Sequence, residues 1–399
     1  MKVLHTADWH LGHTLGDYDR TDEHAAFLRF LLEVIEAEAV DALLIAGDIF
    51  ETANPPVRAE RAWYDFLASA RRKHPDLDIV AIGGNHDSAL RLDAPRPVLR
   101  SVQVHVVGGL PFRSGKQRDL DRILVPLHAE GRVAAWVVAV PYLRAADLPS
   151  VASGDPVREG VRAVWSELAE AARGRREPGQ ALLGMGHLHA EGSSESPDSE
   201  RKVLGRALNA SALFGSSFAY VALGHLHKAQ ELAPGVRYSG SPIPLSMTER
   251  NYEHQVVLVE LDGEDLVDAR PVAVPRTVDL VRVPDEGELP LAEALDELRA
   301  LPDRDLASKT LPFLEVRVSL EKPQPALRHR IERAIDGKAV RLLRVKTAYT
   351  GSGDALVGAE ALQDLDVEDV FLRMWHKDHS EPPAESVLDA FRSLLDAEP

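Results

Sequence analysis

The sequence predicts an α/β fold whose sheets are at least partly parallel. Short apolar runs have the length and composition of buried strands, at residues 2–7, 41–47, 78–84, 133–140, 180–186 and 218–224. Longer stretches with apolar residues three and four positions apart are typical of amphipathic helices, at residues 22–40, 57–73 and 159–173. Because the two kinds of segment alternate along the chain, we expect helices to connect parallel strands.

A second, smaller unit follows a seam at Val274-Pro275-Arg276. After the seam, strand-like segments alternate with helix-like segments, at residues 278–283, 291–301, 313–320, 325–335 and 340–348. A loop, TGSGD, then leads into mostly helical residues. We therefore expect a large domain over residues 1–275, an α+β domain over residues 276–352 and a helical tail over residues 353–399.

The composition indicates a protein of a reducing compartment with a sizeable core. At 399 residues and a hydrophobic share of 45%, the chain has enough apolar residues for a large domain and a smaller one. It has no cysteine, which excludes disulfides, thiolate zinc sites and cysteine nucleophiles. The start, MKVLHTADWH, becomes polar too early for a secretory signal, and no apolar run has the length of a membrane span. We therefore expect a soluble cytoplasmic protein with no membrane partner.

The net charge of −17 argues against polyanionic ligands such as nucleic acid or acidic membranes. A local basic surface or bound cations would have to override this repulsion. Basic runs occur at residues 71–73, 173–176 and 341–346, although such runs more often form solvated faces.

Polar side chains follow five of the predicted strands at the points where the strands end. Nearly all of them are of types that bind metal ions: Asp8, His10, Asp48, Asn85, His86, Asp87, His187, His225 and His227. Because ligands bind outside the carboxyl ends of strands in open α/β sheets, we expect the five loops to meet in one crevice. A single strand-end histidine is more often structural, but five such loops together indicate a metal site.

The ligand types favour manganese, iron or zinc in a mixed oxygen and nitrogen site, since carboxylates, imidazoles and one amide are present and sulfur is not. The ligands are too many for one tetrahedral ion, but they fit two ions that share a bridging aspartate. Two ions about 3.5 to 4 Å apart can hold a hydroxide between them and clamp the oxygens of a phosphoryl group. The expected chemistry is phosphoester hydrolysis.

The ordered motifs resemble those of the calcineurin-like metallophosphoesterases: D-x-H at 8–10, G-D at 47–48, G-N-H-D at 84–87, G-H at 186–187 and G-H-x-H at 224–227. More narrowly, the segments TADWHLG, AGDIFETANPP, ALGHLHKAQ and RYSGSPIPLS resemble the SbcD nuclease family, which is related to the Mre-eleven nucleases. The resemblance implies a two-sheet sandwich flanked by helices, then a smaller α+β capping domain and a helical C-terminal tail that binds a partner.

The resemblance also implies a role for most of the strand-end residues. It assigns one manganese ion to Asp8, His10, Asp48 and His227, and a second to Asp48, Asn85, His187 and His225, so that Asp48 bridges. His86 becomes the proton donor to the leaving oxygen, with Asp87 close enough to orient its ring. A turn-capping role for Asp87 is an equal alternative. The roles of Glu51 and His189 stay open, because neither has a required place in the motifs.

By the same resemblance, the function is that of a manganese-dependent DNA phosphodiesterase, a double-strand exonuclease and single-strand endonuclease in DNA end processing and repair. The implied partner is an SbcC ATPase, bound through an apolar stripe of the last helix that consists of Val387, Leu388, Phe391, Leu394 and Leu395. The stripe would otherwise pack on the chain's own domains.

The resemblance further implies a homodimer through helices near residues 55–101, with Tyr64, Leu67 and Leu92 as candidate contacts. Two other functions stay open. The chain could be a metallophosphatase or phosphodiesterase that acts on a small molecule or phosphoprotein, or a non-catalytic scaffold for an ATPase partner.

Overall fold

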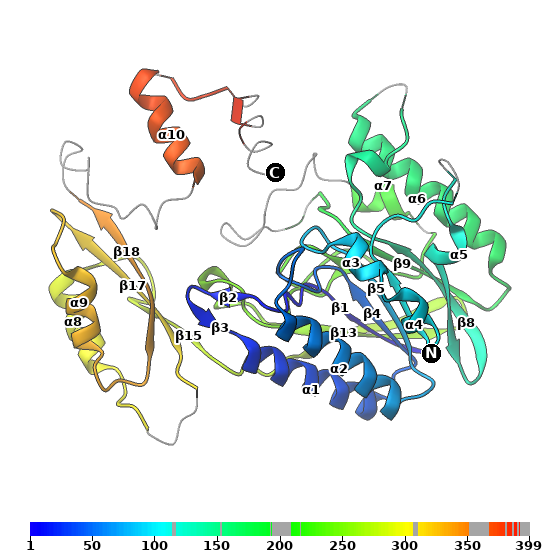
Figure 1. Cartoon of the computed structure of the whole chain (residues 1–399), viewed down its shortest axis with the longest axis horizontal. Coiled ribbons are helices and arrows are strands. Elements are labelled where there is room, and N and C mark those ends of the chain that lie inside the picture. The colour runs from blue at the N-terminus through cyan, green and yellow to red at the C-terminus, as the bar shows by residue number, and fades with distance from the viewer. Residues whose placement is uncertain are drawn as a thin grey trace.

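Two six-stranded sheets form the larger part of the computed structural model (Figure 1). The first sheet contains β1 (Lys2–Thr6), β4 (Ala42–Ala46), β5 (Asp78–Ile82), β6 (Val104–Val107), β13 (Gln255–Asp262) and β14 (Asp265–Ala273). The second contains β7 (Leu124–Ala129), β8 (Arg132–Val140), β9 (Ala181–His187), β10 (Tyr220–Gly224), β11 (Gln230–Ala233) and β12 (Val236–Tyr238). Their orders are β14-β13-β1-β4-β5-β6 and β11-β12-β10-β9-β8-β7.

Parallel pairing runs through the centre of both sheets. Strands β1, β4, β5 and β6 are parallel neighbours in the first sheet, and β8, β9, β10 and β12 are parallel neighbours in the second. A parallel sheet is buried on both faces, which explains why these strands were recognisable as continuous apolar runs. The prediction of an α/β fold with partly parallel sheets is confirmed.

One apolar layer lies between the two sheets. A further apolar layer lies between each sheet and the helices on its outer face. Val3, Leu44, Leu183 and Ala222 belong to the layer between the sheets. Helices α1 (Thr21–Glu38) and α2 (Val57–Lys73) pack on the outer face of the first sheet, and α6 (Pro156–Arg175) packs on that of the second. The remaining elements of this part are short: β2 (Thr14–Leu15), β3 (Tyr18–Asp19), α3 (Ala89–Asp93), α4 (Arg96–Arg100), α5 (Leu120–Ile123), α7 (Ala210–Phe214) and two 3-10 turns (Ala145–Asp147, Met247–Glu249). The expected sandwich flanked by helices is thus confirmed.

A third sheet with two helices follows the sandwich along the chain (Figure 1). In this unit β17 (Phe313–Leu320) pairs in parallel with β15 (Leu280–Val283), β16 (Leu289–Pro290) and β18 (Arg341–Tyr349). Helices α8 (Leu291–Ala300) and α9 (Leu327–Ala334) bury one face of this sheet. The unit contacts the sandwich through a small apolar cluster that contains Leu15, Met247 and Phe313.

The tail contributes one longer helix, α10 (Val367–Asp378). The ring of Phe391 stacks on that of Phe371 in this helix, with 4.1 Å between the centroids, so part of the predicted apolar stripe packs within the tail. Leu394 and Leu395 lie outside the described residues. None of the helices described here is long and apolar enough to cross a membrane. The structure describes residues 1–113, 117–151, 154–191, 193, 209–215, 217–305, 310–350, 367–379, 381–384, 387–388 and 391.

Candidate metal centre

The five predicted loops meet where central strands of both sheets end. Asp8 and His10 follow β1, Asp48 follows β4, and residues 85–87 follow β5. His187 is the last residue of β9, and His225 and His227 follow β10. A hydrogen bond from backbone to side chain ties the loops of the two sheets together, because the amide of His225 donates to Asp8 Oδ1 at 2.9 Å. The five loops therefore meet as expected, and their meeting point lies across the two sheets of the sandwich.

Four of the strand-end residues have left-handed backbone conformations. The φ angles are 55° at Asp8, 47° at His10, 48° at Asp48 and 106° at His225. Residues other than glycine rarely adopt such angles, which cost about 1–3 kcal/mol each and cluster at functional sites. The surrounding structure therefore holds these loops in shapes that they would not adopt on their own.

Trp9 anchors the first loop between its two candidate ligand residues, Asp8 and His10. Its side chain is fully buried and makes edge-to-face contacts with Phe27, Trp63 and Phe66, at centroid distances of 5.5, 5.6 and 5.3 Å. Each such aromatic pair contributes about 0.5–1.5 kcal/mol beyond its buried area. Since Phe27 lies on α1 and the other two rings lie on α2, both helices fix the positions of Asp8 and His10.

Two glycines allow the loops to approach one another closely. A Cβ atom at Gly224 would lie 1.9 Å from the carbonyl oxygen of Ala46, at the end of β4 in the opposite sheet. A Cβ atom at Gly84 would lie 2.1 Å from Asp48 Oδ1. No larger residue fits at either position without displacing a ligand loop.

Four side chains, from the ends of β4, β5, β9 and β10, bring candidate ligand atoms together around one point. Asn85 Oδ1 lies 3.0 Å from His187 Nε2 and 3.1 Å from His225 Nδ1. Asp48 Oδ2 lies 3.3 Å from the same His187 nitrogen. His187 Nδ1 is directed away from this point and donates to the carbonyl of Ala46 at 2.9 Å. These four residues are those that the resemblance assigns to the second ion.

The other side of Asp48 has the features expected of a second position for a cation. His10 Nε2 lies 3.7 Å from Asp48 Oδ2 and is buried without a hydrogen-bond partner. The rings of His10 and His227 are in edge contact, with 5.1 Å between their centroids. Because a buried polar atom without a partner is costly, the orphaned imidazole nitrogen fits coordination to a metal ion.

The charges of the centre also fit a cation beside Asp48. Burial opposes a charge on His187, but Asp48 and Asp8 outweigh it and raise the pKa of His187 to about 9. Burial would raise the pKa of Asp48, yet His187 and His10 hold it well below its usual value. In contrast, burial and the neighbouring His187 keep the pKa of His225 well below its ordinary range. A positive charge is thus already stabilised where a bridging carboxylate would bind cations.

Comparison with known proteins identifies the family. The family model described as calcineurin-like phosphoesterase matches residues 1–229. The SbcD subunit of the SbcCD nuclease from Rhodobacter capsulatus is 43% identical over 356 residues, which is 86% of either chain. The chain belongs to the SbcD family of calcineurin-like phosphoesterases.

A more distant relative, a second family model and a solved structure also match this member of the SbcD family. The SbcD subunit of the SbcCD nuclease from Escherichia coli K12 is 28% identical, over 94% of this chain and 92% of the relative. A family model described as Type 5 capsule protein repressor C-terminal domain matches residues 276–379. A solved dimetal phosphatase from Danio rerio covers 69% of this chain and 99% of its own, with 14% identity and a TM-score of 0.37. As a calcineurin-like phosphoesterase, the chain is a metal-dependent enzyme of phosphoester hydrolysis.

The expected contact between Asp87 and His86 is corrected by the structure. The Asp87 carboxylate accepts hydrogen bonds from the backbone amides of Ile49, Phe50 and Gly84, at 3.1, 3.0 and 2.9 Å. His86 Nδ1 instead donates to the carbonyl oxygen of Glu51 at 2.7 Å. Asp87 therefore fixes the loop after β4 to the loop after β5, which is the turn-capping alternative. Its carboxylate faces amides rather than the imidazole of its neighbour.

Two further carboxylates reach the centre of this SbcD relative, and sequence reasoning gave neither a role. Glu51 Oε2 accepts from His10 Nδ1 at 2.9 Å, and Glu249 Oε1 accepts from His227 Nδ1 at 3.0 Å. His10 in turn lowers the pKa of Glu51 to about 2 against the effect of burial. The spacing of Glu51 from Asp48 could have drawn attention to it. Glu249 belongs to none of the motifs recognised in the sequence, and it lies in a short 3-10 turn after the GSPIPLS segment.

Other residues singled out in the sequence lie at the edge of the centre or outside it. His189 is partly buried, and its Nε2 contacts the Ser193 hydroxyl at 3.1 Å. The basic runs are partly engaged within the chain. Arg71 donates to the carbonyl oxygen of Leu77, Arg176 pairs with Glu264, and Arg341 stacks on Phe313, among other contacts.

Proposed function

We propose that this member of the SbcD family is a manganese-dependent DNA phosphodiesterase, with double-strand exonuclease and single-strand endonuclease activity in DNA end processing and repair. The observation that carries the proposal is the convergence of seven ligand-type side chains from five strand ends, with Asp48 between the other six. The names of the relatives, which are nuclease subunits, support DNA as the substrate.

The donor set fits two divalent ions that share the Asp48 carboxylate. Asp8, His10 and His227 would complete one site, and Asn85, His187 and His225 the other. When bound, the ions supply an activated water and positive charge for the phosphate oxygens. Carboxylate, imidazole and amide donors without sulfur suit manganese among the divalent ions.

In this proposal His86 moves the proton that the leaving alkoxide requires. Its ring is in edge contact with that of His10, at 4.8 Å between centroids, so it borders the centre. The Glu51 carbonyl accepts from Nδ1, which fixes the ring and leaves Nε2 as the nitrogen that would carry the transferred proton. A proton given to the leaving oxygen completes the cleavage of the phosphodiester.

Residues 1–275 form the nuclease domain in this proposal, residues 276–352 a capping domain and residues 353–399 a tail that binds an SbcC ATPase. Helix α10 supplies apolar side chains for such a contact, among them Met374, which is 63% exposed. The names of the relatives, subunits of an SbcCD complex, support this partner.

We also propose a homodimer through the helices near residues 55–101. Its contact residues differ from those expected from the sequence. Leu67 and Leu92 are each 3% exposed and belong to the core of their own chain, so they cannot reach a second copy. Leu90 and Val98, in contrast, are 84% and 70% exposed, and Tyr64 is 39% exposed. An apolar surface of this kind is typical of an interface between copies.

A comparison of three substrates tests the proposed activity. Linear duplex DNA, short single strands and p-nitrophenyl phosphate are incubated with the protein and Mn²⁺, with a chelator control and the Asp48→Ala variant. We expect metal-dependent cutting of both DNA substrates, and faster cutting of duplex ends with SbcC and ATP. Turnover of p-nitrophenyl phosphate with intact DNA would indicate a phosphatase, and no turnover of any substrate a scaffold.

A further inference from the structure

The two proposed metal sites differ in what lies behind their histidines. His10 and His227, on one side of Asp48, each direct Nδ1 to a carboxylate, of Glu51 and Glu249 respectively. His187, on the other side, directs Nδ1 to the main-chain carbonyl of Ala46. Both histidines of the first site thus hydrogen-bond to carboxylates, whereas in the second site His187 hydrogen-bonds to a neutral carbonyl and His225 directs Nδ1 to the neutral Asn85 Oδ1.

This difference has a direct chemical consequence. An imidazole that donates its second N–H to a carboxylate is held in one tautomer and becomes a more basic ligand for a cation. A neutral carbonyl fixes the tautomer too, but it contributes no negative charge. The directly bound groups differ in the same sense, because the first site has two aspartates, Asp8 and Asp48, while the second has Asp48 and the neutral Asn85.

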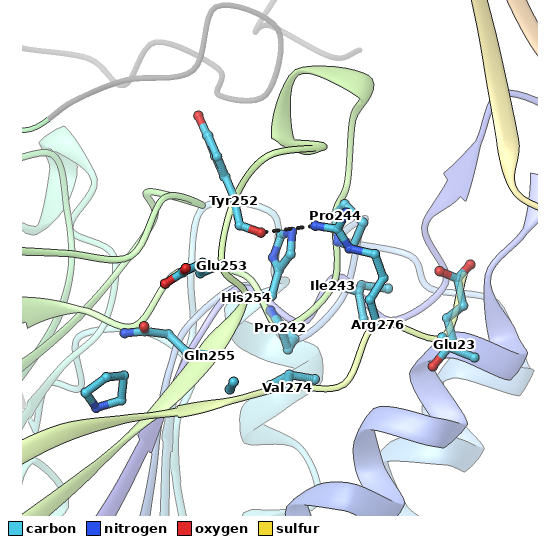
Figure 2. A pocket seen from close by; sticks show the side chains of 13 residues that line it. Glu23, Pro242, Ile243, Pro244, Tyr252, Glu253, His254, Gln255, Val274 and Arg276 are labelled. Atoms are coloured by element: carbon cyan, nitrogen blue, oxygen red, sulfur yellow. Dashed lines mark hydrogen bonds between the residues drawn. The ribbon is translucent and has the colours of Figure 1, made fainter. Parts of the chain in front are cut away.

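The Glu249 contact is more rigid than the Glu51 contact. Glu249 is fully buried, and its Oε2 accepts from the amide of Leu245 at 2.8 Å and from the Ser241 hydroxyl at 3.4 Å. The Ser241 carbonyl accepts in turn from His254 Nδ1 at 2.8 Å. Figure 2 shows His254 in the wall of a cavity of about 410 Å³, between Tyr252 and Arg276.

Glu51 is held differently. Its side chain is 31% exposed and accepts from His10, while its backbone carbonyl holds the catalytic His86. A substitution of this side chain therefore leaves the main-chain contact to His86 available. The two carboxylates can be altered separately from each other and from the proton donor.

We propose that Glu249 and Glu51 are positioning residues that make the ion held by His10 and His227 bind more tightly than the ion held by His187 and His225. The chain then loads one ion first and exchanges the second more readily. The inference rests on the proposed two-ion function, which it refines by assigning the order of binding.

Mn²⁺ titration of the full chain by calorimetry, after removal of metal with a chelator, tests this order. We expect two separate binding events for the wild-type chain. Glu249→Gln and Glu51→Gln keep the shape of the side chain and an acceptor oxygen but remove the charge. Each substitution should weaken the tighter event by about 10–100-fold, the usual effect of losing such a partner, and leave the weaker event within about threefold. The effect should be larger for Glu249→Gln, because Glu249 is the more rigidly held.

A matched control is Glu315→Gln in the third sheet. Glu315 is also fully buried and paired with arginines, but it lies on β17, outside the metal centre. It should leave both binding events unchanged, which separates a metal effect from the general cost of removing a buried carboxylate.

The possible failures are distinguishable. Two ions of equal affinity in the wild-type chain, or equal weakening of both events by Glu249→Gln, would overturn the inference and leave the two-ion site intact. A wild-type chain that binds one ion or none would overturn the proposed function itself. If Glu249→Gln fails to fold in a thermal unfolding scan, the more exposed Glu51→Gln carries the test alone, and an unchanged tight event in that variant overturns the inference.

Discussion

Substitution of Asp87 by alanine is expected to act on stability, because this carboxylate is an acceptor for the backbone of two ligand loops. The side chain is 2% exposed and accepts from the amides of Ile49, Phe50 and Gly84. Each buried amide left without an acceptor costs about 1–3 kcal/mol, so Asp87→Ala should lower the free energy of unfolding by at least about 3 kcal/mol. For a domain of this size, that corresponds to a decrease in Tm of roughly 6–12 °C.

The measurement is thermal unfolding of the metal-free protein in chelator, so that altered metal binding does not contribute. Asp87→Asn keeps one acceptor oxygen of the two and should fall between the wild type and Asp87→Ala. His86→Ala is the matched control in the adjacent position, since its ring makes one hydrogen bond, to the Glu51 carbonyl, and an edge contact with His10, and it should lose less than half as much. A Tm within about 2 °C of the wild type, together with collapsed turnover, would refute this reasoning and place Asp87 in the chemistry.

Four further outcomes are expected. Asp48→Ala should lose both ions by elemental analysis, because it removes the one shared ligand, and near wild-type manganese content would contradict the bridge. His86→Ala should keep both ions and DNA affinity while turnover falls about 10²–10⁴-fold, measured as kcat on a short duplex. Leu90→Glu should give a monomeric mass by light scattering at micromolar concentration where the wild-type chain is dimeric; a wild-type monomer would contradict the dimer. Burial lowers the pKa of His5 from the ordinary value of 6.5 to about 3, so the folded chain resists its protonation and stability should fall as pH falls from about 6.5 toward 3. The loss from this residue is roughly 2 kcal/mol at pH 5, and His5→Gln should flatten the pH dependence of denaturant unfolding in chelator by that amount.

The central strands were predictable because burial on both faces leaves a signal that needs no knowledge of neighbours. Strand β4 is apolar at every position, β5 at all but its first, and β1 is buried at all but its first, and the ends of these strands marked the candidate ligand loops directly. Strand β14 was not predicted. Its sequence, DLVDARPVA, is largely exposed, because this strand lies at the edge of its sheet, and its alternation is interrupted by a proline and two aspartates.

The parts of the centre that the sequence did not reveal depend on directions that only the folded chain defines. Asp87 was paired with His86 because the two are neighbours in the chain, but its carboxylate turns to the loop after β4. Glu249 lies 22 residues beyond His227 and meets it because the intervening segment folds back against the sandwich. No regular spacing in the sequence marks either contact. The candidate metal ligands could therefore be predicted from the sequence, but the residues that support them could not.

The supporting partners explain how the strained loops persist. The left-handed backbone angles at Asp8, Asp48 and His225 each cost about 1–3 kcal/mol relative to a relaxed loop conformation. The three hydrogen bonds to Asp87 and the aromatic contacts of Trp9 hold the loops of Asp48 and Asp8 from behind, at sites that do not face the centre. Since none of these contacts uses a candidate ligand atom, they order the loops independently of coordination. The free energy of metal binding is then available for coordination rather than for ordering the loops, and a substitution behind the loops should weaken metal binding without removing any ligand.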